Sequence, residues 1–233
     1  MLSGEYLVLK GASALAIPVK FGQDLEISVK AGTPKLSWNT YMLGEPWFEA
    51  NFSIPDMAVA NTNDFPIAMN IRDLILAART LNPNFLISPK EYRIQSILDF
   101  NISWGLGSSS SLLVNIANWA KVDPFKLHHL VYKGSGYDVA VSYLNKPVIY
   151  NLKEDNNPDF MEVSFQPSFS DYIYFVYLGR KRDSNEAVHE FQQNGKAYTS
   201  EVSRISVISD ELLKVKDYQG FAELMEEHEL IIS

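Results

Sequence analysis

The sequence contains no cysteine among its 233 residues. This absence excludes a disulfide scaffold, a catalytic thiolate and a zinc site with cysteine ligands. A chain without cysteine is compatible with a reducing compartment, and we therefore expect the protein to be cytoplasmic.

Long apolar runs and a surplus of basic residues are also missing. No apolar stretch approaches the roughly 18 residues that a transmembrane helix requires, and a secretory signal is not expected. The formal net charge of −8 provides no general basic surface for nucleic acid or an anionic membrane. The four histidines lack the spacing of a metal site. We expect neither a nucleic-acid nor a membrane partner, while the oligomeric state, monomer or homodimer, stays open.

What the chain does contain is enough apolar surface for a sizeable core. Hydrophobic residues make up 46% and aromatic residues 12% of the sequence. Strands and helices follow one another without regular βαβ alternation, which predicts an α+β fold. The predicted strands cover residues 5–11, 24–29, 38–54 (as a hairpin with outer decoration), 92–100 and 172–178. The predicted helices cover residues 67–78, 112–120, 125–132, 187–193, 198–215 and 221–231.

Two kinds of local signal divide the chain. Asn63 and Asp64 precede one helical pattern, and Asp123 is a good N-cap residue followed by a proline at the first position of another helix. The polar segment KEDNNPD at residues 153–159 resembles a linker. We therefore predict two domains, 1–155 and 156–233.

The run GLGSSSS at residues 105–111 lies between a predicted strand and a predicted helix. Gly105 and Gly107 allow the backbone to approach a ligand closely, and the serines that follow can cap the helix and donate hydroxyl groups. The N-terminus of a helix supplies free N–H groups and a partial positive charge, which suit a phosphate. Taken alone, the run is equally compatible with a flexible connector. It is neither a Walker A loop nor the dinucleotide fingerprint.

Three segments in order carry a family resemblance: SGEYLVLKGASALAIP (residues 3–18), WGLGSSSSL (residues 104–112) and GSGYDVAVS (residues 134–142). Together they resemble the motifs of the GHMP kinase superfamily, named after galactokinase, homoserine kinase, mevalonate kinase and phosphomevalonate kinase. The sequence looks most similar to the mevalonate and phosphomevalonate kinase side, in particular to a bacterial group with a GSGYD motif. The resemblance implies a first domain like the second domain of ribosomal protein S5 and a ferredoxin-like second half, here incomplete.

The resemblance also implies roles for residues of the second segment. The ATP phosphates would be wrapped by Gly105, Leu106, Gly107, Ser108, Ser109 and Ser110. Ser108 and Ser109 would in addition lie near Mg²⁺.

Further roles come from the first and third segments. Asp138 matches the aspartate proposed as catalytic base in mevalonate kinase-like members, and a carboxylate can accept the proton of an attacking hydroxyl. A helix cap or a salt bridge is the structural alternative for this residue. Glu5, Ser135, Gly136 and Lys181 would shape the substrate site. Buried pairing with a basic residue is the alternative for Glu5, and a solvated charge cluster is the alternative for Lys181.

The sequence departs from the family pattern at three places. No lysine precedes the GE motif, and no third glycine-rich motif follows in the C-terminal part. Leu127 stands where mevalonate kinase places a Mg²⁺-ligating glutamate. We therefore expect the chain to be a fragment or a shortened relative of these kinases.

The resulting hypothesis is an ATP- and Mg²⁺-dependent kinase that phosphorylates a hydroxyl or phosphate of a small metabolite, with mevalonate or phosphomevalonate as the preferred acceptor. Two alternatives stay open. One is an enzyme resembling diphosphomevalonate decarboxylase, and the other is a GHMP relative that binds a nucleotide or metabolite without catalysis.

Overall fold

The computed structural model describes residues 1–153, 155, 157–179, 188, 191, 193 and 197–233. The described chain forms two compact units. The central unit is Val19–Tyr132, and the terminal unit combines Met1–Pro18 with Lys133–Ser233. No helix of the described residues is long and apolar enough to cross a membrane.

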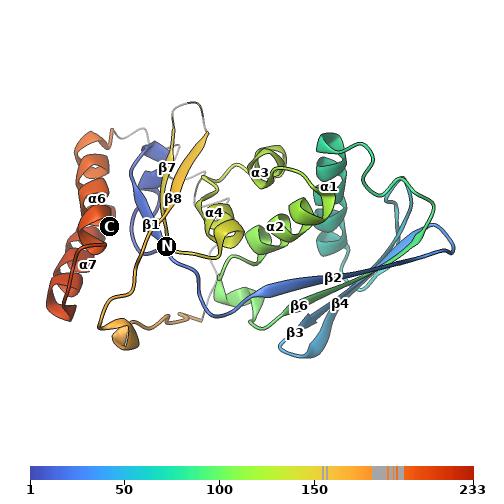
Figure 1. The fold of residues 1–233 in the computed structure, drawn as a ribbon, viewed down its shortest axis with the longest axis horizontal. Coiled ribbons are helices and arrows are strands. Elements are labelled where there is room, and N and C mark those ends of the chain that lie inside the picture. Colours follow the sequence, from blue (N-terminus) through green and yellow to red (C-terminus); the bar gives the residue numbers. More distant parts are fainter. Residues whose placement is uncertain (154, 156, 180–187, 189–190, 192, 194–196) are drawn as a thin grey trace. The chain divides into compact units, whose positions relative to one another are not determined.

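In the central unit two helices pack against a sheet, and a third helix packs on those two helices (Figure 1). Within the described residues the strand order is β2-β6-β3-β4-β5, in which β3 and β6 are parallel and the other neighbours are antiparallel. The strands are β2 (Gln23–Lys30), β3 (Lys35–Met42), β4 (Glu45–Ser53), β5 (Val59–Thr62) and β6 (Glu91–Leu98), and the helices are α1 (Phe65–Leu81), α2 (Ser108–Ala120) and α3 (Pro124–Val131).

The starts of α1 and α3 lie at predicted residues, whereas α2 starts at Gly107 without a side-chain cap, so the predicted capping by the serines was wrong. The side chain of Asp64 accepts a hydrogen bond from the N–H of Ile67 at the start of α1. Asp123 accepts from the N–H groups of Phe125 and Lys126 at the start of α3. Each carboxylate satisfies donors that the helix itself cannot, because the first turn has no preceding carbonyls.

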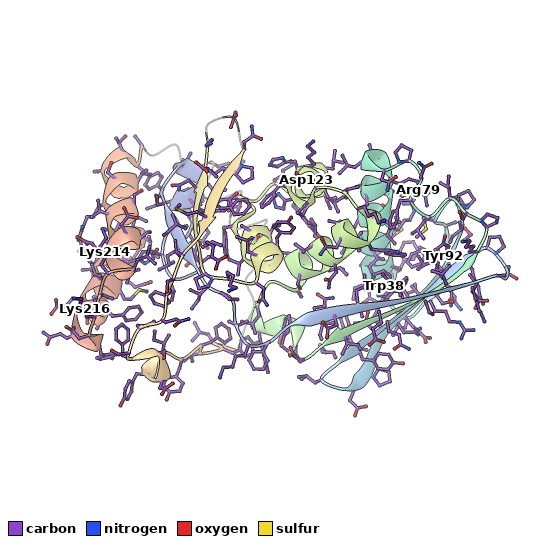
Figure 2. All side chains as sticks on the ribbon, viewed as in Figure 1. Trp38, Arg79, Tyr92, Asp123, Lys214 and Lys216 are labelled. Atoms are coloured by element: carbon purple, nitrogen blue, oxygen red, sulfur yellow. The ribbon has the colours of Figure 1, made fainter. Side chains whose placement is uncertain are left out.

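The hairpin predicted at residues 38–54 is present as the antiparallel pair β3 and β4. β3 lies in the interior of the sheet between β6 and β4, and Trp38 on it is 1% exposed. Figure 2 labels Trp38 on this sheet and Arg79 on α1. Arg79 donates to the carbonyls of Pro55, Phe85 and Leu86, so one guanidinium ties α1 to two loops.

The terminal unit is built on a second sheet with the order β1-β7-β8 among the described residues. Its strands are β1 (Ala14–Ala16), β7 (Val148–Leu152) and β8 (Pro158–Glu162), all antiparallel, and its helices include α4 (Tyr137–Leu144), α6 (Thr199–Leu212) and α7 (Tyr218–Ile232). Helix α4 and the α6–α7 pair pack on the two sides of this sheet (Figure 1). The core on the α6 side is apolar and consists of Leu7, Ala12, Leu15, Ile149, Ile205, Ile208 and Leu212.

Two predicted strands of this unit were wrong. Residues 5–11 form the short 3₁₀ helix η1 (Leu7–Lys10), because the positive φ angles of Gly4 and Tyr6 turn the chain away from an extended path. Residues 172–178 form no strand, and large side chains such as Tyr174 and Leu178 are exposed. An apolar pattern predicts a strand only where a neighbouring strand can pair with it, and none of the described strands pairs here.

The polar segment at residues 153–159, from which the sequence predicted a domain boundary, follows β7 and runs into β8. Leu152 at the end of β7 pairs with Pro158, so the last two residues of the segment, Pro158 and Asp159, lie in β8. The two compact units are divided instead near residues 18 and 133. The predicted division into 1–155 and 156–233 therefore differs from the division by contacts, because strand pairing joins the chain across the linker-like residues.

Candidate functional site

The loop that leads into α2 contains two residues in a left-handed backbone conformation, which only glycine adopts readily. Gly105 ends the 3₁₀ helix η2 (Ile102–Trp104) with φ 75°, and Gly107 caps α2 with φ 80°. A left-handed conformation costs other residues roughly 1–2 kcal/mol. A Cβ at either glycine would meet nothing within 4 Å, so these positions are open. The loop therefore offers exposed backbone directly before a helix N-terminus.

The four serines of the loop differ in what they offer a ligand. Ser109 is exposed and Ser108 is half-buried, whereas Ser110 is 5% exposed. The Ser111 hydroxyl donates to Oε1 of Gln23 at 2.8 Å. The N–H groups of Ser108 and Ser109 come first in the helix and have no intrahelical acceptor. Ser108 and Ser109 are thus the predicted residues best placed to present both N–H and hydroxyl groups.

Aromatic packing supports the other end of the loop. Trp104, directly before Gly105, packs edge-to-face on Phe21 with 5.5 Å between ring centroids. The side chain of Asn101 accepts from the N–H of Ser103 and starts the 3₁₀ helix η2. Leu106 is half-buried between the two positive-φ glycines.

In the terminal unit, Asp138 lies in the first turn of α4. Its Oδ1 accepts from the N–H of Val139 at 3.0 Å, and Gly136 caps the helix with φ 82°. The partial positive charge of the helix start stabilises a carboxylate at this place. Asp138 is therefore not the cap of α4, which is Gly136, and its catalytic role stays a prediction.

Two tyrosines mark the surroundings of Asp138. Burial raises the pKa of Tyr137, and the negative charges of Asp138 and Glu5 raise it further. Burial, followed by the charge of Asp138, also raises the pKa of Tyr150. Both phenols are therefore neutral donors at physiological pH. Glu5, which precedes η1, is exposed, so the alternative of buried pairing with a basic residue was wrong for it.

A hydrogen bond from β7 fixes the segment that precedes α4. Tyr150 donates its hydroxyl hydrogen to the carbonyl of Ser135, which is 7% exposed. This bond fixes the residue next to Gly136, where the chain turns into α4. Sequence reasoning missed Tyr150, because a single tyrosine in an apolar strand carries no local signal of such a contact.

Three further predicted features have different outcomes. Lys181 lies outside the described residues. Leu127 is 0% exposed in α3 and supplies no metal ligand. Among the residues that the structure describes, no group of three or more histidines, aspartates or glutamates could hold a metal ion. The hydroxyls of Ser108 and Ser109 are compatible with Mg²⁺, which is usually held by few protein groups together with phosphates and waters.

No protein-family model matches the sequence, and no curated protein matches it. Solved structures do. The mevalonate kinase of L. major in complex with R-mevalonate is 17% identical, with a TM-score of 0.65 over 99% of this chain and 72% of that chain. The mevalonate kinase of Methanococcus jannaschii is 18% identical, with a TM-score of 0.65 over 99% of this chain and 75% of that one.

A third similar structure is a phosphomevalonate kinase. Streptococcus pneumoniae phosphomevalonate kinase in complex with phosphomevalonate and AMPPNP is 16% identical, with a TM-score of 0.61 over 99% of this chain and 75% of that chain. All three are GHMP kinases. The chain has the GHMP kinase fold. In this GHMP fold the glycine-serine loop and the start of α4 are the segments that carry the predicted site residues.

Proposed function

We propose that this protein is an ATP-dependent small-molecule kinase. It transfers the γ-phosphoryl group of ATP to a hydroxyl or phosphate of a metabolite, and mevalonate or phosphomevalonate is the preferred acceptor. The observation that carries the proposal is the pair of positive-φ glycines before α2, with open space where a Cβ would stand. The GHMP kinase fold supports it. The naming of an S5-like and a ferredoxin-like domain belongs to the same proposal.

The loop binds and orients the phosphates. The free N–H groups of Ser108 and Ser109 donate to phosphate oxygens, and the dipole of α2 favours their negative charge. Gly105 and Gly107 keep side chains away from the approach, and the Ser109 hydroxyl is a further donor. Bound Mg²⁺ would neutralise phosphate charge beside the Ser108 and Ser109 hydroxyls.

Asp138 is the proposed base. Its carboxylate accepts the proton of the acceptor hydroxyl as the oxygen forms its bond to the γ-phosphorus and the bond to the β,γ-bridging oxygen breaks, releasing ADP. Glu5, Ser135, Gly136 and Lys181 are proposed to shape the substrate site.

The test is a coupled ADP-release assay with mevalonate, phosphomevalonate, diphosphomevalonate, sugars and amino-acid alcohols, together with calorimetric titration of Mg-ATP. Acceptor-dependent ADP release together with a phosphorylated product supports the kinase. Carbon dioxide release from diphosphomevalonate identifies a decarboxylase instead. Binding of Mg-ATP without turnover of any acceptor identifies a non-catalytic binder, and an absence of binding overturns the nucleotide site.

A further inference from the structure

Gln23, the first residue of β2, holds α2 by its side chain. Its Oε1 accepts from the hydroxyl of Ser111 at 2.8 Å, and its Nε2 donates to the hydroxyl of Ser96 at 2.9 Å. Ser96 lies on β6 and is 1% exposed. Both ends of the amide are thus bonded, one to the helix and one to the interior of the sheet. The two hydroxyls hold the amide at both ends, since one hydroxyl donates to its oxygen and the other accepts from its nitrogen.

The backbone of Gln23 makes a second attachment to the same helix. Its carbonyl accepts from Nδ2 of Asn115 at 2.7 Å. Ser111 and Asn115 are four residues apart, so they lie on one face of α2, one turn above the other. Figure 1 shows β2 running beside α2. Two bonds at different heights on one face fix both the rotation of the helix about its axis and its position along that axis.

Ser111, which Gln23 holds, lies in the first turn of α2, directly after the glycine-serine loop. The N–H of Ser111 donates to the carbonyl of Gly107 at 3.0 Å. The direction of the free N–H groups of Ser108 and Ser109 therefore follows the placement of Ser111. The other buried contacts of α2 come mainly from apolar side chains such as Leu113 and Ile116, and apolar contacts have no preferred direction. The polar bonds to Gln23 supply the direction.

We propose that Gln23 is a positioning residue for the phosphate-binding loop: it sets the orientation in which the first turn of α2 presents its N–H groups to the nucleotide. The inference rests on the proposed function of that loop. Binding groups must be held within about 0.5 Å of their productive geometry to act together, and a pair of directional bonds to the sheet meets that requirement.

The test measures Mg-ATP affinity by calorimetry and melting temperature for the wild type, Gln23→Met, Ser111→Ala and the double variant. Methionine is close to glutamine in size and removes both amide bonds. We expect the dissociation constant to rise about tenfold in Gln23→Met. Because the two residues act through one bond, Ser111→Ala should weaken binding as well, and the double variant should add little to Gln23→Met. The matched control is Gln95→Met, on the exposed face of β6, which should bind like the wild type.

The outcomes separate this inference from the function on which it rests. A wild type that does not bind Mg-ATP overturns the proposed function and the positioning role together. A wild type that binds, with Gln23→Met within twofold of it, overturns the positioning role alone, even if the variant melts at a lower temperature. Independent, additive effects of Gln23→Met and Ser111→Ala also overturn it. All affinities are measured well below the melting transition, so that a purely structural loss of stability leaves the dissociation constant unchanged.

Discussion

The backbone N–H of Gly4 donates a hydrogen bond to Nε2 of His228 at 3.0 Å, across 224 positions of the chain. His228 is 2% exposed, so the bond joins the GE segment to α7 inside the terminal unit. Nε2 is the acceptor of this bond, and Nδ1 of the same ring lies 3.5 Å from Oε1 of Glu229. Gly4 cannot carry a side chain here, because a Cβ would lie 2.7 Å from that of Ala14.

His228→Ala should lower the free energy of unfolding by about 1–3 kcal/mol, because it leaves a buried N–H without an acceptor. His228→Gln keeps an acceptor and should lose less. The exposed His129 provides the control, since His129→Ala should unfold at the wild-type urea concentration. Equal midpoints for His228→Ala and His129→Ala in urea unfolding followed by circular dichroism would contradict a stabilising role for the bond.

Gly107→Ala should raise the dissociation constant for Mg-ATP about tenfold or more, because alanine is strained at a φ of 80° and the backbone here borders the proposed phosphate site. Gly44→Ala is the matched control. Gly44 has a φ of 85° in the β3–β4 turn and is equally open. Both variants should lose about 1–2 kcal/mol of stability, but only Gly107→Ala should lose affinity in calorimetric titration. Equal affinities would argue against a nucleotide at this loop.

Asp138→Asn should reduce kcat roughly 10²- to 10⁴-fold while Mg-ATP binding stays near the wild type, because the amide keeps the shape of the side chain and cannot accept the proton. The measurement is ADP release at saturating acceptor beside calorimetric titration of nucleotide. Asp159→Asn removes an exposed carboxylate that pairs with Lys153 at 3.3 Å, and it should retain full turnover. Full turnover by Asp138→Asn would remove this residue from the base role.

The contact between α6 and α7 should make stability depend on acid pH. The side-chain hydrogen bonds from Arg204, at 2.5 Å, lower the pKa of Glu227 against the opposing effect of desolvation. A carboxylate with a lowered folded-state pKa contributes stability that is present above its unfolded pKa of about 4.3. That contribution is lost as the pH falls through the folded-state value.

Glu227→Gln should therefore be less stable than the wild type at pH 7, and the difference should shrink as the pH falls below about 4. Urea unfolding at a series of pH values measures it. The neighbouring exposed Glu226 supplies the control variant, Glu226→Gln, for which we expect no comparable difference. If the difference in free energy of unfolding between Glu227→Gln and the wild type stays constant between pH 7 and pH 3, the ionised form of Glu227 does not contribute to stability.

Features that depend on neighbouring residues were predictable from the sequence alone. The caps at Asp64 and Asp123, the helices that they start and the glycine-serine turn before α2 all follow from interactions within a few residues. The GHMP kinase fold was also recognisable, because its motifs are short and contiguous. The roles of Asp138 and of the loop serines remain predictions that rest on the same motifs.

Only the tertiary structure decided what depends on distant partners. The apolar residues 172–178 read as a strand, yet a strand exists only where another pairs with it, and the described chain offers none. The contacts of Gln23 with Ser111 and of Gly4 with His228 span 88 and 224 positions. No local pattern encodes such pairs, because their energy depends on where the fold brings two separate segments together.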